Sequence, residues 1–192
     1  MTREIILNLD KNNPDNKNWG KAIKYFEERF NKRYFDQLDI LIHHNNNNIK
    51  YNCGFLIITI DCILIETLEQ FYEGKNEIKE SDLSFYNFSK RNEKLKSLFE
   101  NRKDAGIFHG IVRSGLVHQA MTKKSSIINV KKKDMTINWI DVDNKKLGFE
   151  INRNNFHNCV IEEYKKYIQI LKTGKDLVVL ENFKQKLLNI LS

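Results

Sequence analysis

The residues best suited to chemistry lie close together, with Arg113, Ser114 and His118 in the run Arg-Ser-Gly-Leu-Val-His. When RNA is cleaved by attack of its own 2′-hydroxyl, one group removes the hydroxyl proton and another protonates the leaving 5′-oxygen. Histidine titrates near neutral pH and can serve either step. A guanidinium suits the negative charge that grows on the phosphate oxygens in the transition state. We therefore predict that His118 is a general acid or base, that Arg113 stabilises the transition state and that Ser114 positions the phosphate, without a metal ion.

The spacing of Arg113 and His118 bears on whether one chain can form a complete site. Five residues on a regular helix correspond to a net rotation of about 140°, so the two side chains diverge, although Gly115 could loosen the turn. We expect that two copies of the chain must meet to complete the site. Gly106 and Gly110, four residues apart on the same predicted helix, are the expected homodimer contact. The alternative is that both glycines serve ordinary packing within one subunit.

Two carboxylates, Asp61 and Glu66, interrupt the most apolar segment of the sequence. Burying a carboxylate without a partner is costly, so each should face a cation, a polar cavity or solvent. We predict that Glu66 orients Arg113, with a surface lysine or solvent as its alternative neighbour. His109 precedes Arg113 by four residues and shares its helix face, as either a second acid or base or a partly buried spectator.

The charge of the chain favours a polyanionic partner. The formal net charge is +7 and the isoelectric point is about 9.2, which is typical of proteins that bind nucleic acid. The abundance of Asn, Lys and Ile could also reflect the coding bias of an A·T-rich genome. Two lysine clusters could neutralise RNA phosphates, or could simply be solvated charge runs. They consist of Lys123, Lys124, Lys131, Lys132 and Lys133.

Several classes of protein are disfavoured by the sequence. The apolar stretch 54–68 is shorter than the roughly 20 residues of a membrane helix and contains two carboxylates. Residues 1–4 lack the basic-then-apolar order of a signal peptide. Cys53, Cys62 and Cys159 are isolated from one another and form no zinc-type cluster. We therefore expect a cytoplasmic protein that uses no membrane, no metal and no cofactor.

The pattern of apolar residues predicts a mainly α fold. Pro14 is the single proline, and the final helices follow a strand-like region that ends in a hairpin with a turn at Asp143-Asn144. We predict one domain over 1–192: a helical bundle core over about 19–124, a β-hairpin over about 126–151 and C-terminal helices over about 155–191. The predicted helices cover 19–43 (capped by Asn18), 50–72, 93–100, 104–123, 155–171 and 177–191, and the predicted strands cover 127–130, 135–142 and 147–151.

A few further side chains can be placed from their surroundings in the sequence. Gly74 should end the helix that precedes it, because glycine is favoured just past a helix C-terminus. Phe85, Tyr86 and Phe88 are expected in the core rather than as platforms for stacked bases. The histidines outside the motif helix, His43, His44 and His157, are expected at the surface.

The motif helix and its neighbour resemble the HEPN superfamily, whose ribonuclease members carry an Arg, four to six residues and then a His. Arg113 and His118 have four residues between them, and the apolar helix 55–71 looks like the helix that packs beside the motif; the resemblance extends weakly over 54–124. Ser114 stands where the family often has Asn, Asp or His. Ala120 stands where one toxin branch has a tyrosine that a partner enzyme modifies, so we do not predict that regulation.

The resemblance implies a fold and an activity. It implies a helical bundle that forms a homodimer, with two motifs facing each other in one composite cleft. It also implies an endoribonuclease that leaves a 2′,3′-cyclic phosphate, in a toxin or antiviral defence role, with an antitoxin or other regulatory partner.

Two rival functions remain open. The first is a non-catalytic HEPN module that binds nucleotides, RNA or a partner protein. The second is a DNA-binding regulator that uses the basic hairpin and in which His118 has no role.

Overall fold

The computed structural model describes residues 1–47, 53–77, 79–122, 126–132, 134, 136–143 and 145–191. Several predictions fall outside these residues. They concern the RNA-binding residues Lys123, Lys124 and Lys133, the turn residue Asn144 and the start of the helix 50–72. The chain forms two compact units, and three of the four boundaries between them fall within helices. Unit 1 comprises Met1–Gln37, Thr67–Lys79 and Tyr164–Ser192, and unit 2 comprises Leu38–Glu66 and Glu80–Glu163.

The regular elements among the described residues of unit 1 are all helices. Its helices are α1 (Arg3–Leu7), α2 (Lys17–Phe30), the π-helical segment η1 (Asn31–Phe35), the second part of α4 (Gly54–Glu73), the second part of α8 (Arg153–Thr173) and α9 (Leu177–Ile190). Helix α2 begins earlier than predicted. Asn16, not Asn18, is its N-cap, because the Asn16 side chain accepts a hydrogen bond from the backbone N–H of Asn18.

Aromatic rings form the centre of unit 1. Phe26 is fully buried, and its ring lies 4.4 Å from that of Phe30 and 4.6 Å from that of Phe71, centroid to centroid. The rings of Tyr167 and Phe183 lie at 5.8 Å and 5.5 Å from it. Edge-to-face arrangements such as these add to the stabilisation that burial of apolar area provides. A single side chain of α2 therefore joins α4, α8 and α9.

Two glycines allow close turns in unit 1. Gly74 ends α4 as predicted, with a φ of +67°, and a Cβ there would lie 2.9 Å from the Cα of Asn182. Gly174, with a φ of +63°, follows α8, and a Cβ there would lie 2.5 Å from the Cβ of Pro14. Both positions need the left-handed backbone and the absent side chain that glycine provides.

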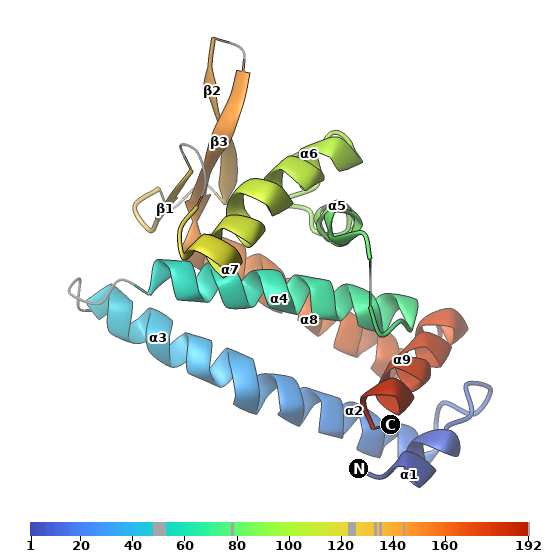
Figure 1. Cartoon of the computed structure of the whole chain (residues 1–192). Helices are drawn as coiled ribbons and strands as arrows, with labels where there is room; N and C mark the ends of the chain where they lie inside the picture. Colours follow the sequence, from blue (N-terminus) through green and yellow to red (C-terminus); the bar gives the residue numbers. More distant parts are fainter. Residues whose placement is uncertain are drawn as a thin grey trace. The chain divides into compact units, whose positions relative to one another are not determined.

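Unit 2 combines helices with a small sheet. It contains most of α3 (Asp36–Asn47), the first parts of α4 and α8, α5 (Ser81–Arg91), α6 (Arg102–Phe108), the π-helical segment η2 (His109–Arg113), α7 (Ser114–Gln119), β1 (Ile127–Asn129), β2 (Ile137–Val142) and β3 (Lys145–Asn152). The prediction of a mainly α protein with a small hairpin before the C-terminal helices is confirmed. Figure 1 shows α6 and α7 as one rod that runs beside β3 and ends at the start of α4.

The sheet has the order β1-β3-β2. Strands β2 and β3 form the predicted antiparallel hairpin, and Asp143 in its turn has a φ of +51°. Strand β1 pairs with β3 in parallel, which the sequence did not indicate. The sheet packs on the helices through Phe149, which is fully buried and lies 5.1 Å from the ring of Phe108.

The predicted helix 93–100 is wrong. Residues 93–98 form consecutive turns. Leu95 and Phe99 are buried and have the spacing of a helix face, which explains the error. A residue of α5 stabilises these turns, because the ammonium of Lys90 donates to the carbonyls of Lys96 and Phe99. The predicted helix 104–123 also ends early, at Gln119.

We predict that Phe26→Ala destabilises the protein by about 3–5 kcal/mol, because the five ring contacts of this side chain cannot be replaced by collapse around a methyl group. Chemical denaturation monitored by circular dichroism measures the change. Val178→Ala in α9, where 68% of the side chain is exposed, is the control and should change stability by less than about 0.5 kcal/mol. Equal effects of the two substitutions would contradict this account of the core.

Candidate functional site

The motif lies on a helical rod that changes its winding at the candidate site. Helix α6 ends at Phe108, η2 covers His109–Arg113 with π-helical hydrogen bonding, and α7 continues to Gln119. Such π segments are rare within helices and often occur at functional sites. Ala120 then adopts a left-handed conformation, with a φ of +54°, and ends the rod. The prediction of one regular helix therefore missed the local change in winding between His109 and Arg113.

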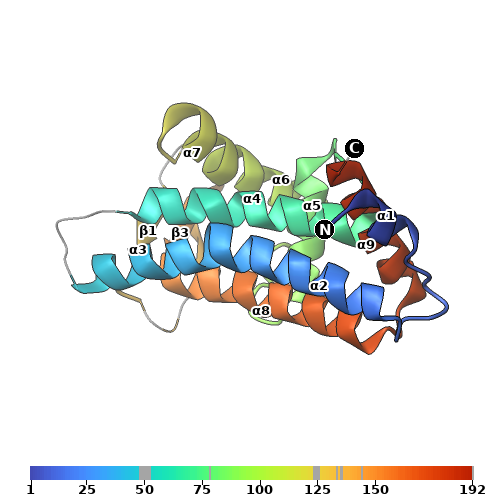
Figure 2. The ribbon, with the colours of Figure 1, turned by 90° about the horizontal axis from the view of Figure 1, so that it is seen from below.

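Arg113 and Glu66 form a two-pronged ion pair. The Nε of Arg113 donates to Oε1 of Glu66 at 2.9 Å, and Nη2 donates to Oε2 at 3.0 Å. The side chains are 22% and 16% exposed, so water screens the pair only partly. The predicted contact between these residues is confirmed, and Figure 2 shows α7 lying over the first part of α4. Because Nε and one N–H of Nη2 are used, the edge formed by Nη1 and the second N–H of Nη2 remains for a phosphate.

His109 also lies close to Glu66. Its Nε2 lies 3.8 Å from Oε1 of Glu66, and its ring lies 5.8 Å from the ring of Phe85. Burial lowers the pKa of His109, and the charges of Arg113 and His118 lower it further, against the opposing effect of Glu66 and Asp82. The neutral imidazole is therefore favoured at neutral pH.

His118 has a different environment. It lies in the last turn of α7, is exposed, and forms no hydrogen bond or ion pair within the described ranges. It is nevertheless near enough to the Arg113 cluster for its charge to affect the pKa of His109. Arg113 thus contacts α4 while His118 is open to solvent. Ser114, the first residue of α7, lies between Arg113 and His118 in the sequence and is half-buried.

The two predicted dimer glycines differ in their surroundings. A Cβ on Gly106 would lie 3.6 Å from the Cβ of Asp82 in α5, so this glycine packs within the chain. A Cβ on Gly110 would meet nothing within 4 Å. Several large apolar side chains of α4 and of the end of the rod are at least 40% exposed. They are Phe55, Leu56, Ile63, Val117 and Met121.

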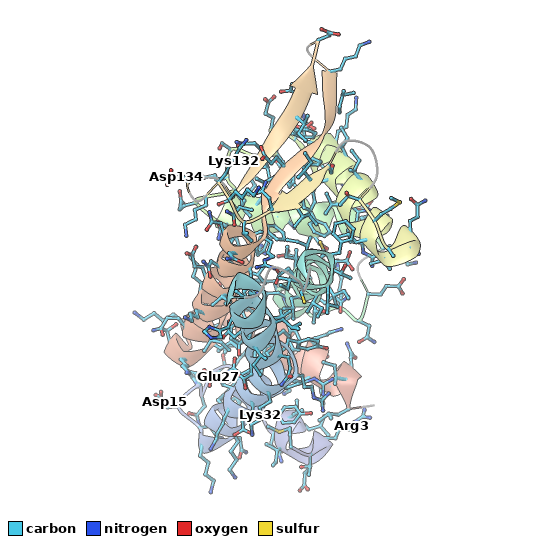
Figure 3. The ribbon with its side chains drawn as sticks, turned by 90° about the vertical axis from the view of Figure 1, so that its left-hand side faces the viewer. Arg3, Asp15, Glu27, Lys32, Lys132 and Asp134 are labelled. Atoms are coloured by element: carbon cyan, nitrogen blue, oxygen red, sulfur yellow. The ribbon has the colours of Figure 1, made fainter. Side chains whose placement is uncertain are left out.

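Two of the five predicted RNA-binding lysines lie in the described residues. Lys131 is exposed and forms no ion pair within the described part of the chain. The ammonium of Lys132 lies 2.6 Å from Oε2 of Glu150 on β3, so its charge is already paired. Figure 3 shows Lys132 and Asp134 near each other on the connection between β1 and β2.

His157 is not at the surface as predicted. It is 1% exposed, and its Nδ1 lies 2.7 Å from Oδ1 of the fully buried Asp61. Burial raises the pKa of Asp61, and the hydrogen bond with His157 opposes this shift. The need of Asp61 for a partner was foreseen, but its identity was not, because the start of α8 is buried on more than one face: Phe156, Cys159 and Val160 are buried as well.

The comparisons with known proteins assign no family. No family model matches the chain, and neither the curated proteins nor the solved structures gave a significant match. Within the described residues, no helix is both long enough and apolar enough to cross a membrane. Nor do three or more His, Cys, Asp or Glu side chains gather there in an arrangement suited to a metal ion.

We predict that His109 makes stability sensitive to acid. Its pKa in the folded chain is below the ordinary value of about 6.5, so the unfolded chain binds this proton first as the pH falls. The stability it contributes is present above pH 6.5 and is lost as the pH falls through the lowered pKa. His109→Gln should therefore lose less unfolding free energy between about pH 7 and pH 5 than the wild type does.

Urea denaturation at a series of pH values measures this difference. Gln119→Ala, an exposed change on the same rod that removes no titrating group, is the control and should keep the wild-type slope. A His109→Gln slope as steep as that of the wild type would contradict the assignment.

Proposed function

We propose that the chain is a HEPN-type, metal-independent endoribonuclease that cleaves RNA by attack of the 2′-hydroxyl on the adjacent phosphorus. The observation that supports the proposal is the Glu66–Arg113 ion pair next to a solvent-exposed His118. A held guanidinium and an accessible imidazole are the two groups that this reaction requires. The net charge of +7 agrees with a polyanionic substrate.

Each step of the reaction can be given to a group. A histidine takes the proton of the 2′-hydroxyl while the 2′-oxygen bonds to phosphorus. The bond from phosphorus to the 5′-oxygen then breaks, and the 5′-oxygen receives a proton, which leaves a 2′,3′-cyclic phosphate and a 5′-hydroxyl. Nη1 of Arg113 would hold a phosphate oxygen as its charge grows, and the Ser114 hydroxyl would help to position it. Glu66 is a positioning residue that acts through Arg113.

The proposal includes a homodimer. One exposed His118 per chain supplies one of the two proton transfers, so a second copy would bring the other His118 and complete the site. The open space at Gly110 and the exposed apolar side chains at the motif favour a contact there, since apolar patches of this kind are common at protein interfaces. The HEPN resemblance implies a role in toxin or antiviral defence, under an antitoxin or other regulatory partner, and we propose that the chain acts in the cytoplasm.

A non-catalytic HEPN module that binds RNA, nucleotides or a partner is the second candidate. It is favoured by the commitment of Nε and Nη2 of Arg113 to Glu66, which leaves a single edge of the guanidinium for a phosphate. In this case Arg113 would bind an anion without RNA being cut, and His118 would transfer no proton.

We predict that His118→Ala lowers the cleavage rate at least about 100-fold, because it removes a proton-transfer group. Arg113→Lys should have a similar effect, since an ammonium keeps a positive charge near Glu66 but lacks the planar fork of a guanidinium. Cleavage of a mixed RNA pool in excess chelator, with analysis of the product ends, measures both rates. The fold of each variant is checked by thermal unfolding.

Gln119→Ala, the exposed neighbour of His118, is the matched control and should cleave at the wild-type rate. Undiminished cleavage by His118→Ala would contradict the proposal, as would loss of wild-type cleavage on adding chelator. RNA binding without cleavage by the wild type would favour the binding module.

We predict that Gly110→Leu weakens self-association at least about ten-fold, because overpacking a close helix contact costs roughly 1–3 kcal/mol. Sedimentation equilibrium measures the dimer dissociation constant. Gly20→Leu is a matched control, since a Cβ on this glycine of α2 also meets nothing within 4 Å. A Gly110→Leu dimer as stable as the wild type would exclude Gly110 from the interface.

A further inference from the structure

A cavity of about 710 Å³ lies in unit 2, away from the residues of the motif. The turns at 93–98, strand β2 and the first turns of α8 all contribute to its wall, and its lining includes Ser97, Trp139 and Asn158. Its volume falls within the range of small-molecule binding sites. The three wall segments are far apart in the sequence, so the cavity is a product of the fold.

The lining is polar, and within the described residues its charges balance. Lys94 is its cation and Asp134 its anion. The ammonium of Lys94 also lies 2.5 Å from Oε1 of Glu162, so its charge is partly neutralised before any ligand arrives. A wall of this kind favours a ligand portion that is uncharged and rich in hydrogen-bonding groups.

Trp139 provides a rigid aromatic surface in this wall. Its indole Nε1 donates to the carbonyl of Leu98 at 3.1 Å, and its ring lies 4.2 Å from that of Phe149. Both contacts hold the indole in one orientation. Stacking on a side chain that is already fixed costs little conformational entropy, and every nucleobase has a face that can stack in this way.

A carboxamide of α8 lines the same cavity as the indole. Asn158 of α8 lines the cavity, is exposed, and uses its side chain in no hydrogen bond within the described ranges. Asn138 of β2 also lines the cavity, but its side chain lies on the face of the strand opposite to Trp139, because successive side chains alternate along a strand. Each carboxamide offers a donor and an acceptor side by side, which is the pattern that matches the edge of a nucleobase. Ser97 adds a hydroxyl that is also exposed.

We propose that this cavity binds an unpaired nucleobase, which stacks on Trp139 and is read at its edge by Asn158. The base is uncharged, planar and rich in donors and acceptors, as the wall requires. A sugar–phosphate attached to it could pair with Lys131, which is exposed and forms no ion pair within the described residues. Lys131 directly precedes Lys132, which Figure 3 shows near Asp134 of the lining. The base belongs either to an RNA strand or to a free nucleotide, and the experiment separates these sources.

Fluorescence of Trp139 tests the proposal directly. The chain has two tryptophans, so Trp19→Phe in unit 1 leaves Trp139 as the single reporter. This variant, which also carries His118→Ala to prevent cleavage, is titrated with each of the four ribonucleosides to about 10 mM. We expect saturable quenching by at least one nucleoside. Adding Asn158→Ala should weaken that binding about ten-fold, because a paired edge group is lost.

Asn31→Ala, which removes an exposed carboxamide from η1, is the matched control and should leave binding unchanged. A single-stranded oligoribonucleotide of the preferred base is then compared with the nucleoside and its monophosphate. Tighter binding of the oligomer, lost in Asn158→Ala, identifies the base as part of an RNA strand. Equal binding of the monophosphate and the oligomer identifies a free nucleotide.

Absence of quenching by all four nucleosides would overturn the proposal, as would quenching that Asn158→Ala does not weaken. Displacement of the signal by a neutral disaccharide or an extended peptide, but by no nucleoside, would also overturn it. All these measurements record binding in a protein that lacks His118, so they remain informative if the ribonuclease proposal fails.

Discussion

The ion pair between Glu66 and Arg113 is the constraint on which the candidate site depends. A half-buried carboxylate and a half-buried guanidinium each have a high free energy alone, and they are tolerated because each satisfies the other. Two parallel hydrogen bonds fix the orientation of the guanidinium plane as well as its position. The pair also joins α4 to the π-helical turn, so the winding of the rod and the direction of Arg113 are linked.

This constraint gives two nearby histidines different properties. His109 lies against Glu66 and Phe85, and burial together with the Arg113 charge keeps its pKa low. His118 lies five residues beyond Arg113 and is exposed. Proton transfer to a substrate requires access, so His118 is the better acid or base, whereas His109 is better suited to shaping the environment of Glu66 and Arg113. Sequence reasoning left both roles open for His109, and its burial favours the second.

The parts of the fold that sequence reasoning found follow local rules. Helical periodicity located α2, α4, α8 and α9, and alternation located the hairpin. The Glu66–Arg113 contact was found because a carboxylate in an apolar helix needs a cation. The errors arise where distant segments decide the outcome. Leu95 and Phe99 have helical spacing, but the ammonium of Lys90 stabilises turns there instead.

The same distinction explains which site features were missed. His157 is followed by a polar residue and looks like a surface histidine, yet it is buried against Asp61 of α4, about a hundred residues away in the sequence. The parallel pairing of β1 with β3 joins segments about 20 residues apart, which no local pattern encodes. The polar cavity needs three separate segments to exist at all. Its Asn and Ser residues are common types whose spacing in the sequence carries no signal.

The cavity and the motif share one aromatic core, which bears on how they could work together. Trp139 contacts Phe149, Phe149 contacts Phe108, and Phe108 directly precedes the π-helical segment. Close-packed rings transmit small displacements because the interior has little free volume. The chemistry of the two places also differs, since the described lining of the cavity is balanced in charge and contains amides, while the motif offers a guanidinium and an exposed imidazole. A nucleotide divides in the same way, into an uncharged base and an anionic phosphate, so one RNA strand could engage both through different parts of its structure.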